Sequence, residues 1–180
     1  MTTRRTFDRI LVANRGEIAV RVFQACTELG KTTIAIYSEA DALAPHRYKA
    51  DEAYLVGAGL TPVGAYLDAA GIVALAVERG VDAIHPGYGF LSERADFAAR
   101  CAEAGLTFVG PGVGLLALFG DKAQARAAAT AAGIPILRGL DHGVSLEEAT
   151  AFFESLGEGG AMIIKAVAGG GGRGTRAVME

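Results

Sequence analysis

The chain has 180 residues, of which 51% are hydrophobic and 21% are charged, and its formal net charge at pH 7 is −3. This composition is typical of a folded globular protein with one full domain and part of another, and it excludes an intrinsically disordered chain. The small negative charge gives no reason to expect nucleic acid or an anionic membrane as a partner, and no apolar run reaches the length of a membrane span.

The first 110 residues alternate short apolar runs with helical patterns. Continuous apolar strands joined by helices predict a parallel sheet covered on both faces, which is a doubly wound α/β fold. We expect strands at residues 9–14, 32–37, 53–56, 81–85 and 107–109, and helices at residues 16–29, 66–79 and 92–104. Glycines that can adopt a left-handed conformation follow these helices at Gly30, Gly80 and Gly105.

The pattern changes after residue 110, and we divide the chain there. Residues 1–110 are expected to form the α/β domain, residues 111–136 a helical linker, and residues 137–180 the start of a second domain. The linker contains a predicted alanine-rich helix at residues 122–132 with Asp121 as its N-cap.

The second unit is predicted to contain only a helix at residues 145–156 and a hairpin of strands at 162–166 and 177–178. Such a unit is too small to bury a core alone, so we expect it to open a domain that continues past residue 180. Cys26 and Cys101 both fall in predicted helices, which indicates reduced structural thiols and a cytoplasmic location.

The turn after the first strand, residues 13–17, lies where a dinucleotide-binding fold carries the pattern G-x-G-x-x-G. This turn has a single glycine, so we reject an NAD site. Glu39 and Asp41 follow the second strand and could mimic the ribose-binding acid of that fold. Without the glycines we interpret both side chains as solvated loop acids.

A run of four glycines, Gly169–Gly172, is followed by two arginines. Backbone amides and guanidinium groups of this kind can surround phosphate oxygens. The segment is not a Walker loop, because Thr175 stands where the lysine belongs. A flexible turn is the alternative, but Lys165 in the preceding apolar strand favours an anion site, since burial disfavours an unpaired charge.

The segment His85–Glu93, which reads HPGYGFLSE, follows the carboxyl end of a predicted strand. Ligands bind at that end in open α/β sheets. Gly87 and Gly89 would let a substrate lie close to the backbone, and Ser92 can cap the next helix. A tight turn in which His85 is a hydrogen-bonded residue near the core explains the spacing equally well. No spacing typical of a metal site occurs among the histidines and cysteines.

Four of these segments, in the same order, resemble the biotin carboxylase component of biotin-dependent carboxylases. They are ILVANRGEI at residues 10–18, HPGYGFLSE at 85–93, GDK at 120–122 and IKAVAGGGGRG at 164–174. YKADEAY at residues 48–54 and TPVGAYL at residues 61–67 look most similar to pyruvate carboxylases and single-chain acyl-CoA carboxylases.

The resemblance implies a Rossmann-like pre-ATP-grasp domain followed by the truncated start of an ATP-grasp lid. In this family ATP and bicarbonate form carboxyphosphate, and the N1 atom of carrier-linked biotin accepts the carboxyl group. The cofactors implied are ATP, Mg²⁺ and biotin, and the partners are a biotin carboxyl carrier domain and a carboxyltransferase. Tyr88 and Gly89 correspond to residues near the biotin pocket. The ATP-binding positions implied are Lys122, Lys165, Gly169, Gly170, Gly171, Gly172, Arg173 and Gly174.

The resemblance also implies a homo-oligomer in which the first helix takes part. Arg21, Gln24 and Glu28 form one polar stripe on that helix and are the candidate interface, with a solvated face as the alternative. Two positions depart from the family pattern. Gln24 replaces a common basic residue, and Thr175 stands where a methionine usually packs near the adenine.

The family's magnesium-binding glutamates, orienting arginines and general base all follow the lid loop, and none has a counterpart here. We therefore expect no catalytic residue and no metal ligand within the chain, and no catalysis by these 180 residues alone. A short module that binds nucleotide or pairs with a carboxylase is the alternative. Another ATP-grasp ligase, such as a carbamoyl phosphate synthase, is a third possibility, against which the segment at residues 85–93 and the glycine loop argue together.

Overall fold

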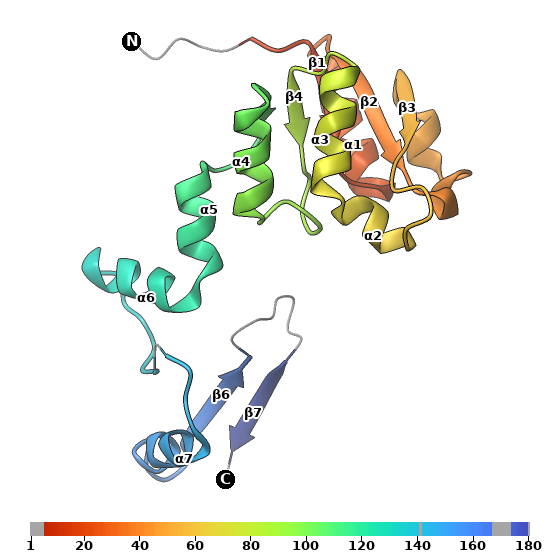
Figure 1. Cartoon of the computed structure of the whole chain (residues 1–180). Coiled ribbons are helices and arrows are strands. Elements are labelled where there is room, and N and C mark those ends of the chain that lie inside the picture. Colours follow the sequence, from red (N-terminus) through yellow and green to blue (C-terminus); the bar gives the residue numbers. More distant parts are fainter. Residues whose placement is uncertain (1–5, 141, 167–173, 180) are drawn as a thin grey trace. The chain divides into compact units, whose positions relative to one another are not determined.

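A computed structural model describes residues 6–140, 142–166 and 174–179 (Figure 1). The glycine run and Arg173 lie outside these residues. The chain divides into two compact units, Met1–Gly120 and Asp121–Glu180, and each is described by itself.

Five parallel strands form the sheet of the first unit, as the apolar runs predicted. Their order is β3-β2-β1-β4-β5, so β1 lies in the centre of the sheet. Ile10 of β1 lies opposite Thr33 of β2 on one side and opposite Ala83 of β4 on the other. The strands are β1 at Arg9–Val12, β2 at Thr32–Tyr37, β3 at Glu52–Leu55, β4 at Ala83–His85 and β5 at Thr107–Phe108.

Helices cover both faces of this sheet, which confirms the doubly wound architecture (Figure 1). Leu11 of β1 packs on the side that carries α2, α3 and α4, whereas Val12 packs against α1 on the other side. Successive residues of a strand point to opposite faces, so a strand buried on both sides has to be apolar throughout. The helices are α1 at Gly16–Glu28, α2 at Pro62–Leu67, α3 at Ala69–Glu78, α4 at Ala95–Glu103 and α5 at Val113–Gly120, with short 3₁₀ turns at Glu39–Asp41 (η1) and Pro45–Tyr48 (η2).

Two helix boundaries differ from the sequence prediction. The helix expected at residues 66–79 is two helices, because the Asp68 carboxylate accepts a hydrogen bond from the Gly71 amide (3.0 Å) and starts a new helix. Ser92 does not cap the following helix. Its own amide donates to the Gly89 carbonyl (2.9 Å) within a turn, and α4 begins only at Ala95. Helix α5 lies in the stretch that we expected to form a helical linker.

The second unit contains two helices and a hairpin among its described residues. These are α6 at Lys122–Ala131, α7 at Leu146–Glu154, and the antiparallel strands β6 at Ala161–Lys165 and β7 at Thr175–Met179. The predicted cap of α6 is confirmed, because the Asp121 side chain accepts hydrogen bonds from the amides of Ala123 (2.9 Å) and Gln124 (3.1 Å). Ser145 and Glu148 form a reciprocal capping box at the start of α7.

Lys165 is exposed in this structure, contrary to the burial that the sequence suggested. Strand β6 belongs to a two-stranded hairpin, and its central Ile163 is 61% exposed. An apolar strand in such a hairpin does not place a lysine in a dry interior, so the desolvation argument for an anion at Lys165 fails. The register still places Lys165 opposite Thr175, at the end of the hairpin where the chain enters the glycine loop.

The two cysteines are free and buried inside helices, as expected. Cys26 lies in α1 and Cys101 in α4. Burial raises the pKa of both thiols, that of Cys101 to about 11, because a thiolate is poorly solvated there. Both therefore remain protonated near neutral pH.

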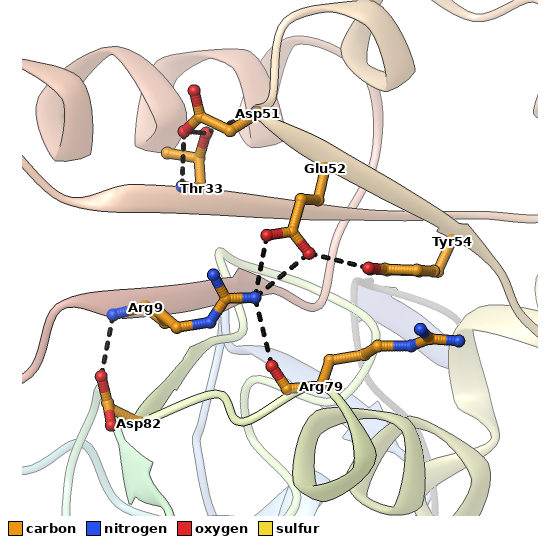
Figure 2. Close-up of polar contacts among 7 residues, drawn as sticks. All are labelled: Arg9, Thr33, Asp51, Glu52, Tyr54, Arg79 and Asp82. Carbon is orange, nitrogen blue, oxygen red and sulfur yellow. Dashed lines mark hydrogen bonds and ion pairs between the residues drawn. The ribbon is translucent and has the colours of Figure 1, made fainter.

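Polar side chains join three elements at the amino-terminal edge of the sheet (Figure 2). The Nη2 atom of Arg9 donates to both carboxylate oxygens of Glu52 (2.9 and 3.1 Å) and to the backbone carbonyl of Arg79 (3.1 Å). The Tyr54 hydroxyl donates to Glu52 (2.7 Å), and the pKa of Glu52 is lowered by these hydrogen bonds. Asp82 accepts hydrogen bonds from the Arg9 amide and from the amide before it, each at 2.9 Å.

We expect Arg9→Met to lower the free energy of unfolding by about 1 kcal/mol, because one guanidinium links β1, β3 and the end of α3 in a partly exposed site. Urea unfolding of the chain followed by circular dichroism would measure the loss. Arg94→Met is the matched control, since the Arg94 side chain pairs with Asp96, two residues away on the surface, and its loss should cost less than about 0.5 kcal/mol. Equal losses in the two variants would contradict a linking role for Arg9.

Candidate biotin-side site at the carboxyl edge of the sheet

The carboxyl ends of the strands meet at the edge opposite Arg9 and its partners Glu52 and Asp82. The order of the strands reverses at β1, because β2 and β3 lie on one side of it and β4 and β5 on the other. In open α/β sheets ligands bind at the carboxyl ends of the strands beside such a switch point. The segments that follow β1 and β4, residues 13–17 and 85–93, therefore lie together where a ligand is expected.

Asn14 connects these two segments directly. Its side chain is fully buried, and its Nδ2 atom donates to the carbonyls of Pro86 (2.7 Å) and Tyr88 (2.9 Å). Its Oδ1 atom accepts a hydrogen bond from the Arg15 amide (2.9 Å). Both amide protons are used, so the buried polar group is satisfied and the loop after β4 is attached to the turn after β1.

The loop after β4 contains a cluster of left-handed residues. Gly87 and Gly89 have φ angles of +64° and +72°, and Phe90, which is not a glycine, has a φ of +44°. That conformation costs a side-chain-bearing residue about 1–2 kcal/mol, so the surroundings must hold it in place. The Phe90 ring contributes by packing against the ring of Tyr66, with centroids 5.3 Å apart.

Internal packing requires glycine at position 87, which is a reason that the sequence did not indicate. A Cβ atom at this position would lie 2.6 Å from Cγ2 of Ile18 and 2.7 Å from Nδ2 of Asn14. At Gly89 no heavy atom lies within 4 Å of such a Cβ, so the backbone there faces open space. Tyr88, between them, is 66% exposed.

His85 ends β4 and is half-buried and hydrogen-bonded, as the tight-turn interpretation expected. Its Nδ1 atom accepts a hydrogen bond from the Gly87 amide (3.0 Å), so the neutral ring carries its proton on Nε2. Burial lowers the pKa of His85, which favours this neutral form. The ring lines a shallow groove between α1 and the loop, together with Glu17, Arg21 and Tyr88.

Asp41 is buried and paired, and our interpretation of it as a solvated loop acid is wrong. Arg15 holds its carboxylate with two hydrogen bonds, from Nε (2.6 Å) and Nη2 (2.5 Å), and the Tyr66 hydroxyl donates a third (2.7 Å). These donors lower the pKa of Asp41 to about 2, while burial and the carboxylate raise the pKa of Tyr66 to about 12. Glu39, in the same turn, is exposed as expected.

The remaining predicted site residues lie on both units. Arg21, Gln24 and Glu28 are exposed on α1 and form a chain of hydrogen bonds, from Arg21 Nη1 to Gln24 Oε1 (2.6 Å) and from Gln24 Nε2 to Glu28 Oε1 (3.2 Å). Lys122 is the first residue of α6, and Lys165 ends β6. Of the glycine loop only Gly174 is described, with a φ of +73°, and Gly169–Arg173 lie outside the described residues.

Neither a metal centre nor a membrane span is found in the part of the chain that the structure describes. No group of three His, Cys, Asp or Glu side chains there is placed to hold a metal ion. Within the same residues no helix is long and apolar enough to cross a membrane.

Sequence reasoning overlooked Asn14 and misread Asp41. An asparagine at the end of a continuous apolar strand is a buried polar group that needs partners, and this was a usable signal for Asn14. For Asp41 no local signal existed, because its partners Arg15 and Tyr66 are 26 and 25 residues away.

We expect Asp41→Asn to lower the free energy of unfolding at pH 7 by about 2 kcal/mol, since the pKa falls from its ordinary value to about 2 on folding. A lowered folded-state pKa stabilises the chain above about pH 4, and this stabilisation is lost as the pH falls toward about 2. Wild type should therefore lose this increment in that window, and the variant should not. Glu39→Gln is the control and should behave as wild type in urea unfolding across the same pH range.

If Asp41→Asn and wild type lost the same stability between pH 4 and pH 2, the pairing with Arg15 would contribute nothing to folding.

The comparisons with known families divide the chain as the structure does. The family model of the biotin carboxylase N-terminal domain matches residues 6–116, and that of the ATP-binding domain of the carbamoyl-phosphate synthase L chain matches residues 121–180. Mitochondrial pyruvate carboxylase of Mus musculus is 57% identical over 171 residues, which cover 94% of this chain and 14% of that protein. Pyruvate carboxylase of Bacillus subtilis is 53% identical over 176 residues, covering 98% and 15%.

Solved structures agree with this similarity. The biotin carboxylase domain dimer of Hydrogenobacter thermophilus 2-oxoglutarate carboxylase, determined with MgADP, ADP and bicarbonate, has a TM-score of 0.89 and 47% identity over 97% of this chain and 38% of that one. A single-chain, multi-domain long-chain acyl-CoA carboxylase has a TM-score of 0.83 and 45% identity over 96% of this chain and 16% of that one.

The chain spans about one seventh of the length of the curated relatives it matches, namely 14% and 15%. The family model nevertheless covers most of the first unit, including both segments that meet at Asn14. The chain belongs to the biotin carboxylase N-terminal domain family of biotin-dependent carboxylases.

Proposed function

We propose that the chain forms the first part of a biotin carboxylase, an ATP-dependent ligase that carboxylates carrier-linked biotin with bicarbonate. The observation that carries this proposal is the similarity, with a TM-score of 0.89, to a biotin carboxylase domain determined with MgADP and bicarbonate. In the first step bicarbonate oxygen attacks the γ-phosphorus of ATP, which gives carboxyphosphate and ADP. A general base of the full protein then removes the N1 proton of biotin, N1 forms a bond to the carboxyl carbon of carboxyphosphate, and inorganic phosphate leaves.

In this proposal Tyr88 and Gly89 form one side of the biotin pocket. Gly89 has open space beside its Cα atom, and Tyr88 is exposed, so a ligand can reach the backbone of both residues. The neutral ring of His85 lies beside them with its Nε2 proton available as a donor. All three follow β4 at the switch point of the sheet, where the fold class places ligands.

ATP is assigned to the second unit, with Lys122, Lys165 and the glycine loop Gly169–Gly174 around the phosphates. Lysine suits this task because its ammonium is a compact charge that pairs with phosphate oxygens. The exposure of Lys165 at the loop end of the hairpin leaves its charge accessible to a nucleotide. A glycine loop between two strands can close over bound phosphates as a lid. No step is assigned to Mg²⁺ here, since the described residues offer it no cluster of ligands.

The partners in this proposal are a biotin carboxyl carrier domain and a carboxyltransferase, which passes the carboxyl group to the final acceptor. We also propose that the carboxylase dimerises through the stripe of Arg21, Gln24 and Glu28 on α1. The three side chains are exposed and are already ordered by their mutual hydrogen bonds, which lowers the entropy lost on association. A cytoplasmic location is part of the proposal, supported by the two free cysteines.

The first test uses the native protein that carries this segment, isolated with an antibody against it. We expect it to form ADP in a reaction that depends on bicarbonate and on free biotin. Lys165→Met should raise the KM for ATP about tenfold or more by removing a charge from the phosphates. Lys31→Met, which removes a lysine paired with Asp8 outside the proposed sites, is the control and should leave this KM unchanged.

The 180-residue chain alone should form no ADP under the same conditions. Turnover by this chain would show that it already holds the catalytic base. Absence of biotin-dependent ADP formation by the native protein would overturn the proposed function and favour a module that only binds nucleotide or pairs with a carboxylase.

Charge reversal in the stripe tests the proposed dimer. Arg21→Glu places a second acid near Glu28 and breaks the bond to Gln24, so we expect the dissociation constant of the carboxylase dimer to rise about tenfold or more. Sedimentation velocity over a range of concentrations would measure the shift. Arg100→Glu makes the same change of charge on α4 and serves as the control. Unchanged association of the Arg21 variant would identify the stripe as a solvated face.

A further inference from the structure

Among the residues that the structure describes, the Asn14 side chain joins the turn after β1 to the loop after β4 by two hydrogen bonds. Both protons of its amide point at carbonyls of that loop, those of Pro86 and Tyr88. The Tyr88 carbonyl belongs to the peptide that continues into Gly89. The bond at 2.9 Å therefore sets the direction of the peptide plane between the two residues assigned to the biotin pocket.

The loop needs such a restraint because its conformation is intrinsically unfavourable. Gly87, Gly89 and Phe90 all have positive φ angles, and two of the three are glycines, which lose much backbone freedom when they are ordered. Without the two hydrogen bonds of Asn14, the Phe90 backbone would gain by returning to a negative φ. A change of φ at Phe90 would turn the adjacent Gly89 peptide away from the pocket.

The packing around Asn14 leaves it a single position. Gly87 contributes because it lacks a side chain, since a Cβ there would lie 2.7 Å from Asn14 Nδ2. The bond from the Arg15 amide to Oδ1 fixes the side-chain amide in one orientation. A second connection runs in parallel, because Phe90 packs on Tyr66, Tyr66 donates to Asp41, and Asp41 holds the side chain of Arg15.

We propose that Asn14 is a positioning residue for biotin, which fixes the backbone of Tyr88 and Gly89 in the conformation that accepts the ureido ring. This inference rests on the proposed function, because it assigns the ligand of the loop from it. Asn14 is fully buried and acts through the loop without touching the ligand. A substitution of Asn14 should therefore weaken the binding of biotin and leave the formation of carboxyphosphate from ATP and bicarbonate intact.

The two steps can be measured separately in the native full-length carboxylase. Bicarbonate-dependent ATP cleavage without biotin reports the first step, and biotin-dependent ADP formation reports the second. We expect Asn14→Ala to raise the KM for biotin about tenfold or more, as a small misplacement of a binding group does. Its biotin-independent ATP cleavage should stay within about twofold of wild type, because ATP is assigned to a unit that this substitution leaves unchanged.

Thr33→Val is the matched control for a general loss of stability. Thr33 is also a buried polar residue of the same sheet, and its hydroxyl both donates to Asp51 (2.7 Å) and accepts from the Asp51 amide (3.0 Å). This pair lies near the amino-terminal end of β2 (Figure 2), whereas the loop follows the carboxyl end of β4. Thr33→Val should leave the KM for biotin unchanged. A KM that rises equally in both variants would overturn the proposal.

Gly87→Ala gives a second, independent variant if Asn14→Ala fails to fold. Its added Cβ pushes on Asn14 from the loop side at a positive φ, so it should also raise the KM for biotin with ATP cleavage retained. If the KM for biotin of this variant matched that of Thr33→Val, the proposal would fail as well.

Hydrogen exchange of the loop separates this inference from the proposed function. Amides of residues 87–90 should exchange about tenfold faster in Asn14→Ala than in wild type, while Thr33→Val leaves them unchanged. Faster exchange in a protein without biotin-dependent turnover would remove the proposed function and retain the positioning of the loop. Unchanged exchange would overturn the positioning role, whatever the turnover.

Discussion

The parallel pairing of β1 with both β2 and β4 determines where everything else in the first unit lies. Because all strands of the sheet run in one direction, their carboxyl ends share an edge. The strand order reverses at β1, so the segment that follows β1 lies beside the segment that follows β4. Asn14 follows β1 at this edge, and the loop of residues 85–93 follows β4 beside it. Two segments that are 72 residues apart in the chain thus become neighbours within hydrogen-bonding distance.

The two edges of the sheet use polar groups differently. At the amino-terminal edge Arg9 and Glu52 form a partly exposed ion pair that ties strands and a helix together (Figure 2). At the carboxyl edge the loop itself is held by the neutral amide of Asn14, while the charged pair of Arg15 and Asp41 lies to one side. A neutral amide holds the backbone carbonyls of the loop without adding a formal charge beside them.

Most of the sheet was predictable from sequence because its signals are local. A strand buried on both faces must be apolar throughout, and glycines such as Gly30 end helices by their own conformational freedom. The break at Asp68 and the late start of α4 were not predictable, since they depend on which hydrogen bond a side chain or turn forms. The site was harder still. The motif at residues 85–93 was visible as a pattern, but the reason for Gly87 is Asn14, and that contact exists only after the strands have paired.

The burial of both cysteines has a practical consequence for future work on this carboxylase segment. Since the thiols of Cys26 and Cys101 are buried and protonated near neutral pH, maleimide reagents should react with them only slowly in the folded chain. A cysteine introduced at an exposed position, such as Leu137 between the α/β unit and the hairpin, would then accept a fluorophore without removal of the native ones. The wild-type sequence is accordingly a ready background for labelling at a single chosen position.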